Sequence, residues 1–456
     1  MTSTQNTENV DLGTGSVGKL LFRLALPAIT AQIINVLYNM VDRMYIGHLP
    51  EEGANALTGV GVTFPIIMAI SAFAALVSMG GAPRASIMLG KGKKMEAEQI
   101  LSNCTTALLA MAVLLTVIIQ LFGRQILLMF GASENTIGYG WAYMQIYSLG
   151  TVFVQLSLGL NAFINAQGYA KTGMRTVMIG AVCNIILDPI FMFLLHMGVR
   201  GAALATIVSQ GISSAWVVLF LISKKSYLNI RPEYMKPKWE ILGPAIALGA
   251  SPFVMQFTES ILNVCFNTSL LKYGGDLAVG AMTILGSVMQ FSMLPLQGMT
   301  QGAQPIVSFN YGAGKLPRVS RAFYLLLASC MIYSTVLWAV CMFAPTVFVS
   351  IFTKDATLRQ FSVWAIRIYM ATSLLFGAQI ACQQTFIALG NSKTSLFLAF
   401  LRKVILLIPL IYILPNLFEN KVFAVFLAEP VADTLAVCTT VTLFTISFRK
   451  LKREQN

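Results

Sequence analysis

Charged side chains are scarce in this chain of 456 residues. Aspartate, glutamate, lysine and arginine together make up 11% of it, against about 25% in typical soluble proteins, while hydrophobic residues make up 56%. A chain with so little charge cannot cover an ordinary globular surface, which excludes a soluble domain of usual composition. We therefore predict an integral membrane protein. The net charge of +13 does not indicate nucleic-acid binding, because the basic residues lie in short segments between apolar runs.

Side chains that usually bind metals or catalyse reactions are equally few. The chain has two isolated histidines, His48 and His196, and its seven cysteines form no Cys-x-x-Cys pair. This argues against a zinc or histidine-based site, and the thiols are expected to be free and buried. A phosphate loop of the form Gly-x-x-x-x-Gly-Lys-[Ser/Thr] is also missing, so no ATP-driven mechanism of that class is indicated. We predict a protein that is not an enzyme and has no cofactor.

Long apolar runs divide the chain into twelve segments that are long enough to cross a bilayer. We expect these spans at 18–46, 55–80, 99–121, 141–167, 174–196, 201–222, 241–271, 278–304, 322–346, 360–388, 396–416 and 422–446. The fold class predicted is an all-α integral membrane protein with twelve transmembrane helices.

The longest polar stretch between spans lies at mid-chain and separates two groups of six. The predicted organisation is a disordered N-terminus at 1–17, an N-terminal lobe at 18–222, a linker at 223–240, a C-terminal lobe at 241–446 and a basic tail at 447–456.

Two short motifs recur at one common offset along the chain. Gly90-Lys-Gly-Lys93 is matched by Gly312-Ala-Gly-Lys315, and Gly168-x-x-Lys-Thr172 is matched by Gly390-x-x-Lys-Thr394 at the same distance. Each half would hold six spans, an even number, so both halves would insert in the same direction. The repeat predicts two six-helix lobes related by a pseudo-two-fold axis along the membrane normal, with a cleft between them.

The basic residues lie unevenly on the two sides of the predicted spans. The side that carries both termini holds 21 of the 31 lysines and arginines, and the other side holds 7. Because cytoplasmic loops are enriched in these residues, we expect both termini in the cytoplasm.

Polar side chains recur inside the spans of the first lobe. Asn184 and Asp188 lie four residues apart, so they share a helix face, and Pro189 after them frees a backbone carbonyl that helps to form a polar site. A carboxylate at mid-membrane costs about 2.5–3.5 kcal/mol, and such residues usually mark ion or proton paths. Asp42 and Thr206 lie in other spans of the same lobe.

These side chains, with Asn161 in span 4, offer only oxygen donors to a bound ion. Oxygen-rich sites suit hard cations, and two neighbouring buried carboxyl groups tend to retain a proton. The sequence therefore supports a proton site, a sodium site, or one site that accepts either. The alternative is that the polar side chains only join helices through hydrogen bonds.

The second lobe carries different polar residues. Glu259 in span 7 has no local partner, and we expect it to meet a cationic substrate. Glu429 and Asp433 lie four apart in span 12, where they are positioned to pair with Arg402 or Lys403 in span 11.

Methionines at positions 282, 289 and 293 share roughly one face of span 8. Such flexible side chains adapt to varied ligands, so Met282, Met289 and Met293 are candidates for substrate contact. The alternative is ordinary packing against lipid or core.

Several of these elements together resemble the multidrug and toxic compound extrusion (MATE) family, in particular its MepA-like branch. The resemblance covers nearly the whole chain and depends on five motifs: Leu26-Pro27, Leu37-Tyr-Asn-Met-Val-Asp42, Gly90-Lys-Gly-Lys93, Ala166-Gln-Gly168 and Asn184-Ile-Ile-Leu-Asp188-Pro189.

The resemblance implies a V-shaped pair of lobes that exports amphipathic, mostly cationic organic compounds in exchange for protons or sodium ions. It implies that Pro27 bends span 1, and Glu259 resembles the span 7 glutamate of a second branch that couples ions through its second lobe. Tyr38 is a further candidate for substrate contact. A span 10 aspartate used by a second branch of the family is missing from the segment 377–383. The coupling residues implied by the match are Asp42, Asn161, Asn184, Asp188 and Thr206.

The function predicted is a monomeric efflux antiporter of a bacterial inner membrane, surrounded by lipid and acting on small organic molecules. One alternative is a flippase or exporter of a lipid-linked precursor, in which Arg367, Arg402 or Lys403 would hold a diphosphate. Another is an intramembrane enzyme that uses Asp42 and Asp188 as an aspartyl pair, although no known protease motif surrounds them.

Overall fold

The computed structural model describes residues 11–50 and 53–453, and these residues form helices and connecting loops without a strand. The helices of the first half are α1 (Val17–Gly47), α2 (Gly53–Gly61), α3 (Phe64–Gly90), α4 (Lys94–Met129), α5 (Ile137–Leu149), α6 (Thr151–Ala166), α7 (Ala170–Pro189), η1 (Ile190–Leu194) and α8 (Gly198–Ile222). Those of the second half are α9 (Trp239–Gly312), α10 (Leu316–Phe343), α11 (Pro345–Phe352), α12 (Ala356–Tyr369), α13 (Phe376–Ala388), α14 (Ser392–Phe400), η4 (Leu401–Leu407), α15 (Ile408–Ile413) and α16 (Lys421–Arg453). Short turns η2 (Pro232–Tyr234), η3 (Ser373–Leu375) and η5 (Leu414–Asn416) complete the set.

The described helices account for twelve membrane crossings. Nine helices are long and apolar enough to span a membrane, and two bent pairs, α5 with α6 and α12 with η3 and α13, raise the number to 11. The 74-residue helix α9 counts twice, because its backbone breaks at Gly275, where φ is 64° and ψ is −162°. Only glycine adopts such angles easily. The prediction of twelve spans is confirmed, although the second span ends at Gly90 rather than at residue 80.

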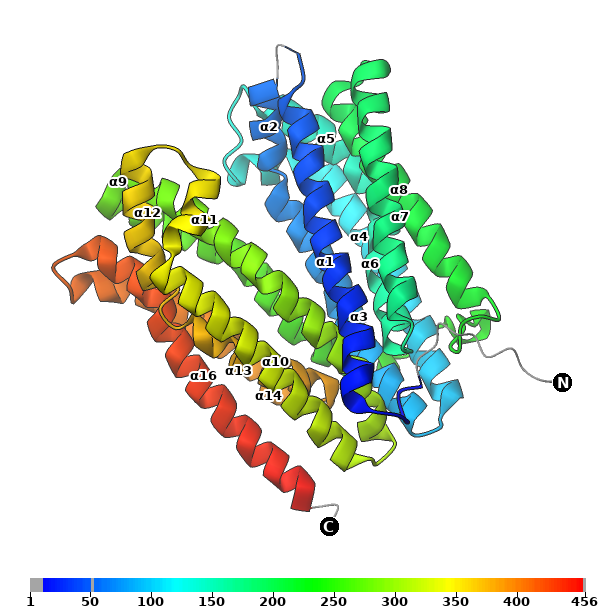
Figure 1. The fold of residues 1–456 in the computed structure, drawn as a ribbon. Helices are drawn as coiled ribbons and strands as arrows, with labels where there is room; N and C mark the ends of the chain where they lie inside the picture. Colours follow the sequence, from blue (N-terminus) through cyan, green and yellow to red (C-terminus); the bar gives the residue numbers. More distant parts are fainter. Residues whose placement is uncertain (1–10, 51–52, 454–456) are drawn as a thin grey trace.

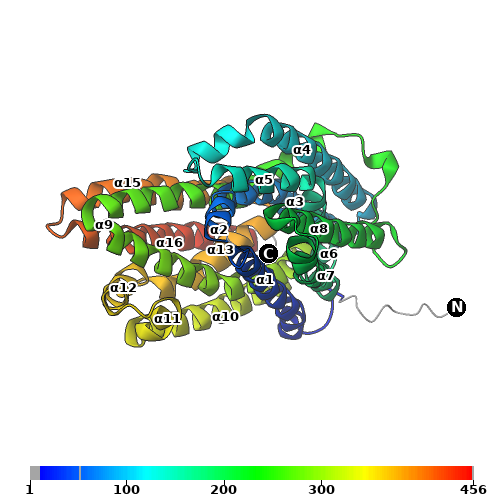
Figure 2. The same cartoon turned by 90° about the horizontal axis from the view of Figure 1, so that it is seen from above.

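The two halves form separate lobes that diverge along the membrane normal. In Figure 1 they approach each other at the end where α1 begins and α16 finishes, and they spread apart toward the opposite end. We call these the termini end and the open end. Seen from above in Figure 2, the C-terminal lobe lies on one side and the N-terminal lobe on the other, with α1 between them.

Glycines allow the lobes to touch backbone to backbone near the termini end. A Cβ atom at Gly80 of α3 would lie 1.8 Å from the Ala245 carbonyl oxygen of α9, so this contact admits no side chain. A second line of contact, which we call the glycine seam, runs between α1 and α9. There a Cβ at Gly302 would lie 2.5 Å from the Cα of Ala25 in α1. Small residues at helix interfaces are the usual way for transmembrane helices to pack closely. These contacts join the lobes at one end only.

The lobe contact is itself two-fold symmetric. A Cβ at Gly90 would lie 2.0 Å from the Phe309 carbonyl oxygen, and a Cβ at Gly312 would lie 2.0 Å from the Ile87 carbonyl oxygen. Gly90 and Gly312 are separated by the offset of the sequence repeat, and so are Ile87 and Phe309. The contact that Gly90 makes with the second lobe is therefore repeated by its counterpart Gly312 with the first lobe, as in an isologous interface. Helices α1 and α9 also begin at this offset from each other. The predicted repeat and its axis are therefore present in the backbone.

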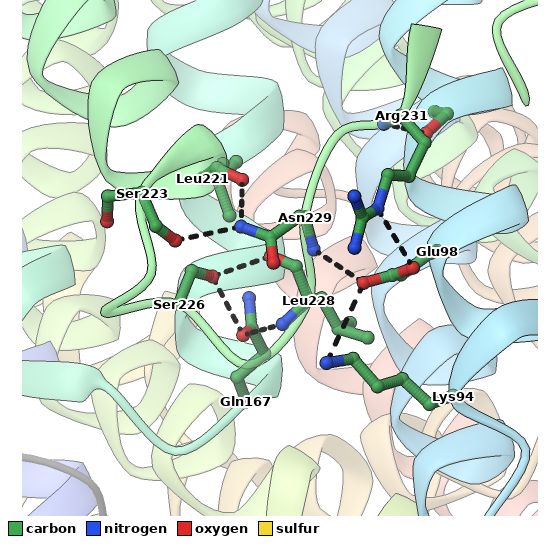
Figure 3. A network of polar contacts seen from close by, with 10 residues as sticks. Lys94, Glu98, Gln167, Leu221, Ser223, Ser226, Leu228, Asn229 and Arg231 are labelled. Atoms are coloured by element: carbon green, nitrogen blue, oxygen red, sulfur yellow. Dashed lines mark hydrogen bonds and ion pairs between the residues drawn. The ribbon is translucent and has the colours of Figure 1, made fainter. Parts of the chain in front are cut away.

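The mid-chain linker is an ordered segment that lies against the N-terminal lobe. Figure 3 shows its first part, where Gln167 Oε1 accepts hydrogen bonds from Leu228 N at 2.8 Å and from Ser226 Oγ at 3.1 Å. The buried carboxylate of Glu98 on α4 accepts from Asn229 N at 3.2 Å and forms an ion pair with Arg231. The linker that connects the two lobes thus lies along α4 of the N-terminal lobe.

Its second part is attached to α4 through side chains that satisfy backbone groups. Asn103 Nδ2 donates to Tyr234 O at 2.9 Å, while its Oδ1 accepts from Lys238 N at 2.7 Å. Thr106 Oγ1 donates to Met235 O at 2.7 Å. These bonds fix the chain up to the first residue of α9.

The segment before α1 is attached in the corresponding way to the C-terminal lobe. Asn310 Nδ2 donates to Leu12 O at 2.9 Å, and Lys315 Nζ donates to Gly13 O at 2.9 Å. The expectation of disorder through residue 17 is therefore wrong for residues 11–16, because basic and amide donors of the other lobe hold their carbonyl groups. Residues 1–10 lie outside the described part of the chain.

Candidate functional site

One face of α9 shows where the lobes separate. Near the termini end this face carries Ala245 and Gly249, which contact α3, and the ring of Phe253 lies 5.0 Å from that of Phe73. Continuing along the same face at helical spacing, the side chains of Glu259 and Asn263 are exposed. A face that is closed at one end and exposed at the other borders a cleft between the lobes.

The exposed part of this face is polar, whereas the opposite face is apolar. On that side Ile261 and Val264 are 43% and 57% exposed, as lipid-facing residues are, while the exposed Phe257 stacks on Phe253 with ring centroids 5.6 Å apart. The cleft face carries Glu259, whose side chain is 59% exposed, next to Asn263. Charged side chains avoid lipid. The distribution therefore assigns the polar face to an aqueous cleft.

A cluster of polar side chains lies inside the N-terminal lobe. On α7, Asn184 Nδ2 donates to Asp188 Oδ1 at 3.1 Å and lies 3.5 Å from Thr206 Oγ1 of α8. The side chain of Asp42, from α1, is within hydrogen-bonding reach of the Asp188 carboxyl group. Asn184 and Asp188 are buried, with at most 1% exposure. Four of the five predicted coupling residues are therefore brought together by three helices.

The cluster contains more acceptors than donors. Asp42 Oδ1, Asn184 Oδ1 and Asp188 Oδ2 are buried without a hydrogen-bond donor among the described residues. An ionised carboxylate only accepts, so two carboxyl groups within bonding reach share a hydrogen bond only when a proton lies between them. Buried acceptors without partners are unfavourable by about 1–3 kcal/mol each. This donor deficit is chemically suited to bind a proton or a hard cation.

Two residues that the sequence did not indicate as part of this cluster complete it. The hydroxyl of the buried Tyr143 on α5 is within hydrogen-bonding reach of Thr206, and the hydroxyl of Tyr38 is within reach of Gln210 on α8. The rings of Tyr143 and Tyr147 are stacked with centroids 5.9 Å apart. Tyr38, predicted as a substrate contact, thus borders the carboxylate cluster instead. A tyrosine in an apolar span gives no signal that separates it from a packing residue.

The structure does not place Asn161 in this cluster. Its Nδ2 donates to the Gly173 carbonyl oxygen at 3.2 Å, near the start of α7. Gly173 precedes Asn184 by eleven residues, which corresponds to about 16 Å along a helix axis. Span 4 bends by 59° between α5 and α6. Tyr143 of α5 is within hydrogen-bonding reach of Thr206, and the assignment of Asn161 to the coupling set stays a prediction.

Pro27 lies in the part of α1 that runs along the C-terminal lobe. Helix α1 continues without a break from Val17 to Gly47. Pro27 is buried between Ala25 and Ile29, whose backbones contact Gly302 and Gly298. The bend predicted at Pro27 stays a prediction.

The C-terminal lobe contains a second charged cluster. Arg402 Nε donates to Asp433 Oδ1 at 2.6 Å, and its Nη2 lies 3.4 Å from Glu429 Oε1. The predicted pairing of these two acids with a base of span 11 is confirmed. Lys403 makes a different contact, since its Nζ lies 2.5 Å from Glu259 Oε2. Glu259, which had no local partner in the sequence, is thus paired with a residue of a distant span.

The three methionines of span 8 lie mainly within the C-terminal lobe. Met282 is 5% exposed, and Met289 and Met293 are half-buried against the core of that lobe. In the same half of α9, Gln290 and Gln297 are exposed. Among the described residues no group of three or more His, Cys, Asp and Glu side chains is arranged to hold a metal.

Comparison with known proteins places this arrangement in a family. The MatE family model matches residues 27–190 and again residues 252–413, once in each lobe. The chain belongs to the MatE family. It is 25% identical to the multidrug export protein MepA of Staphylococcus haemolyticus over 424 residues, which cover 92% of this chain and 93% of that protein. The MepA of Staphylococcus aureus strain N315 is 24% identical over 429 residues, with the same coverage.

Solved MatE-like structures share the fold. A multidrug resistance MATE transporter of the MOP superfamily, solved in an outward-facing conformation, superposes with a TM-score of 0.91 at 22% identity and covers 98% of this chain and 99% of its own. A MOP superfamily transporter from Pyrococcus furiosus, described as having a binding pocket of reverse polarity, superposes with a TM-score of 0.90 at 22% identity, with the same coverage. The chain is thus a multi-pass membrane protein with the twelve-helix MATE fold.

Proposed function

We propose that this chain is a multidrug efflux antiporter of a bacterial inner membrane, which exports amphipathic, mostly cationic organic compounds in exchange for protons or sodium ions. The observation that carries the proposal is the contact between the carboxyl groups of Asp42 and Asp188, buried in the N-terminal lobe with acceptor oxygens that lack donors. MatE family membership and the names of the MepA relatives support multidrug export.

Ion binding at this cluster would act on α1. Asp42 is the only acidic residue of α1, and its carboxyl group meets Asp188 on α7. A proton or sodium ion between them replaces repulsion by attraction, which draws the open-end half of α1 toward α7. Because the other half of α1 packs on the C-terminal lobe through Gly298 and Gly302, a shift of α1 changes how the lobes meet.

The energy available sets a limit on the exchange. One ion moving inward across 100 mV yields about 2.3 kcal/mol, and a tenfold ion gradient adds about 1.4 kcal/mol. When a monovalent cationic drug leaves for each ion that enters, no net charge moves and the electrical contribution vanishes. A one-to-one exchange driven by that gradient therefore sustains only a tenfold drug gradient, so strong export of cations requires more than one ion per drug.

The substrate would bind in the cleft between the lobes. The charge bias of the loops supports cytoplasmic termini, which makes the open end the outer side in this conformation. Glu259 supplies a carboxylate on the cleft wall for a cationic group, beside Asn263. Both positions lie within the second segment that the family model matches.

The flippase alternative is less well supported by the charges. A lipid-linked diphosphate requires cations that face the cleft and are free to bind it. Arg402 is paired with Asp433 and Glu429, and Lys403 is paired with Glu259. Both intramembrane cations of span 11 are thus paired with carboxylates, which leaves the exposed Arg367 of α12 as the remaining candidate for holding a diphosphate.

The test is ethidium efflux from proteoliposomes with proton and sodium gradients imposed separately. We expect one gradient or both to drive efflux in the wild type and neither to do so in Asp188→Asn. The control is Asp276→Asn, which removes an exposed acid at the break of α9 and should leave efflux unchanged. Persistent coupling in Asp188→Asn would show that the first-lobe cluster is not the coupling site.

A further inference from the structure

Lys403 is a buried cation with an exposed partner. Its side chain is 9% exposed and its Nζ lies 2.5 Å from Glu259 Oε2, while the Glu259 side chain is 59% exposed at the cleft. An ordinary buried ion pair shields both charges from solvent. Here only the lysine is shielded, so the carboxylate presents its remaining oxygen to whatever enters the cleft.

The backbone around Lys403 is irregular. Residues Leu401–Leu407 form a π-helical segment between α14 and α15. Such segments are uncommon and frequently occur at functional sites, because the wider turn redirects side chains. Within this segment Arg402 bonds to Asp433 of α16 and Lys403 to Glu259 of α9, because adjacent helix positions point in directions about 100° apart.

Acidic groups outnumber basic groups in the charged cluster of the second lobe. The carboxyl groups of Glu259, Glu429 and Asp433 face two cations, Arg402 and Lys403, so the charges balance only when one carboxyl group retains a proton or a further cation binds. Asp433 Oδ2 is buried without a donor among the described residues. The site therefore has capacity for one additional positive charge, and its exposed member is Glu259.

We propose that Lys403 is a tethered counter-ion that competes with the cationic group of the substrate for Glu259 and thereby sets the affinity of the cleft for cations. This inference depends on the proposed export function and names a residue that determines its specificity. A ligand ammonium that binds Glu259 releases the Lys403 ammonium, whose flexible four-carbon chain lets it turn toward Glu429. Glu429 interacts electrostatically with Lys403 already in this conformation.

Competition of this kind favours cations and speeds their release. A neutral compound cannot replace Lys403 at the carboxylate, so it gains nothing from Glu259. A cationic compound replaces one ion pair by another, and the returning lysine displaces it when the cleft opens. The net affinity is thus kept moderate, as a transporter that must release its substrate requires.

The experiment measures binding of matched ligands to the purified full-length chain in nanodiscs. Ethidium anisotropy gives direct Kd values, and displacement by tetraphenylphosphonium or by neutral triphenylphosphine oxide compares a cation with an uncharged ligand of similar shape. We expect Lys403→Met and Lys403→Gln to lower the Kd of both cations at least fivefold and to change that of the neutral ligand less than twofold. Lys403→Arg keeps the counter-ion and should stay within about twofold of the wild type.

Other outcomes would overturn the inference. Equal changes for the cation and the neutral ligand would show a structural effect of Lys403, and weaker cation binding in Lys403→Met would show that the lysine helps rather than competes. If neither the Met nor the Gln variant folds, as judged by its melting temperature and elution profile, Lys403 is a structural ion. Dye efflux by the wild type is measured in parallel. A wild type that binds cations but does not transport them would disprove the proposed export, whereas the competition between Lys403 and cations would still hold.

Discussion

The side-chain amide of Asn184 donates a 3.1 Å hydrogen bond to Asp188 one helical turn later, and the same amide lies 3.5 Å from the Thr206 hydroxyl. One amide thus joins the carboxylate of α7 to α8. In this position it orients Asp188 toward Asp42 on α1.

Replacement of Asn184 tests this orientation. Asn184→Leu keeps the approximate volume but removes the donor, so we expect ion-driven ethidium efflux to fall at least tenfold, while binding of ethidium in the absence of a gradient is kept. The control is Asn161→Leu, because Asn161 bonds to Gly173 at the other end of α7. We expect it to retain coupling. Loss of coupling in Asn161→Leu instead would return that residue to the coupling set.

The charged cluster of the second lobe gives a prediction about stability. Arg402 is 13% exposed and bonds to both Glu429 and Asp433. Removal of one partner from a buried ion pair usually costs about 3–5 kcal/mol, because the remaining charge is left uncompensated. Arg402→Met should therefore lower the melting temperature strongly.

A compensating variant separates charge from packing in this cluster. Arg402→Met combined with Glu429→Gln and Asp433→Asn removes all three charges, and we expect it to recover most of the melting temperature lost in Arg402→Met. If the triple variant is no more stable than the single one, the guanidinium contributes mainly through packing.

The sequence predicted the architecture well because hydropathy and repetition are local or periodic signals. Twelve apolar runs correspond to twelve crossings, and the repeat that relates Gly90 to Gly312 recurs as reciprocal backbone contacts. Asn184 and Asp188 were found because a four-residue spacing fixes their common face. The correct predictions therefore come from hydropathy, from the repeat and from helical spacing.

The misses come from geometry that periodicity does not encode. The contact of Tyr143 with Thr206 was not indicated by the sequence, and no residue pattern gave the 59° bend of span 4. Glu259 and Lys403 pair although they belong to spans far apart in the sequence, and the π-helical segment that contains Lys403 has no sequence signature. Residues 11–16 looked disordered because their partners belong to the other lobe.

The segment before α1 gives a prediction that can be tested by proteolysis. Arg318 donates to the carbonyl oxygens of Leu12, Thr14 and Gly15, so one guanidinium holds three backbone groups. Arg318→Met should release this segment and speed cleavage within residues 11–16 at least fivefold under limited proteolysis. The control Arg321→Met removes an exposed arginine of the same helix and should not change the cleavage rate.

Acid should release the same segment, and the direction of this pH dependence follows from the pKa of Asp11. Hydrogen bonds from the Thr14 hydroxyl and Gly13 N, together with the nearby Lys315 and Arg318, hold the pKa of Asp11 below its ordinary value of 3.8. Because the pKa of Asp11 is lowered in the folded protein, its carboxylate stabilises the turn fully at pH values above the ordinary pKa. This contribution is lost as the pH falls through the lowered pKa. We expect protection from pepsin cleavage at pH 4 and its loss at lower pH, with Asp11→Asn unprotected throughout.

The glycine seam between the lobes gives the last prediction. A Cβ at Gly302 would lie 2.5 Å from the Cα of Ala25, whereas a Cβ at Gly286 on the same helix meets no atom within 4 Å. Gly302→Val should force α1 away from α9, because overpacking at a closed contact costs about 1–3 kcal/mol and neither backbone can yield easily. We expect lower efflux and a lower yield of a disulfide engineered across the termini end. Gly286→Val, which adds the same side chain in open space, should leave both unchanged, and equal effects of the two variants would show that valine disturbs α9 itself rather than the lobe contact.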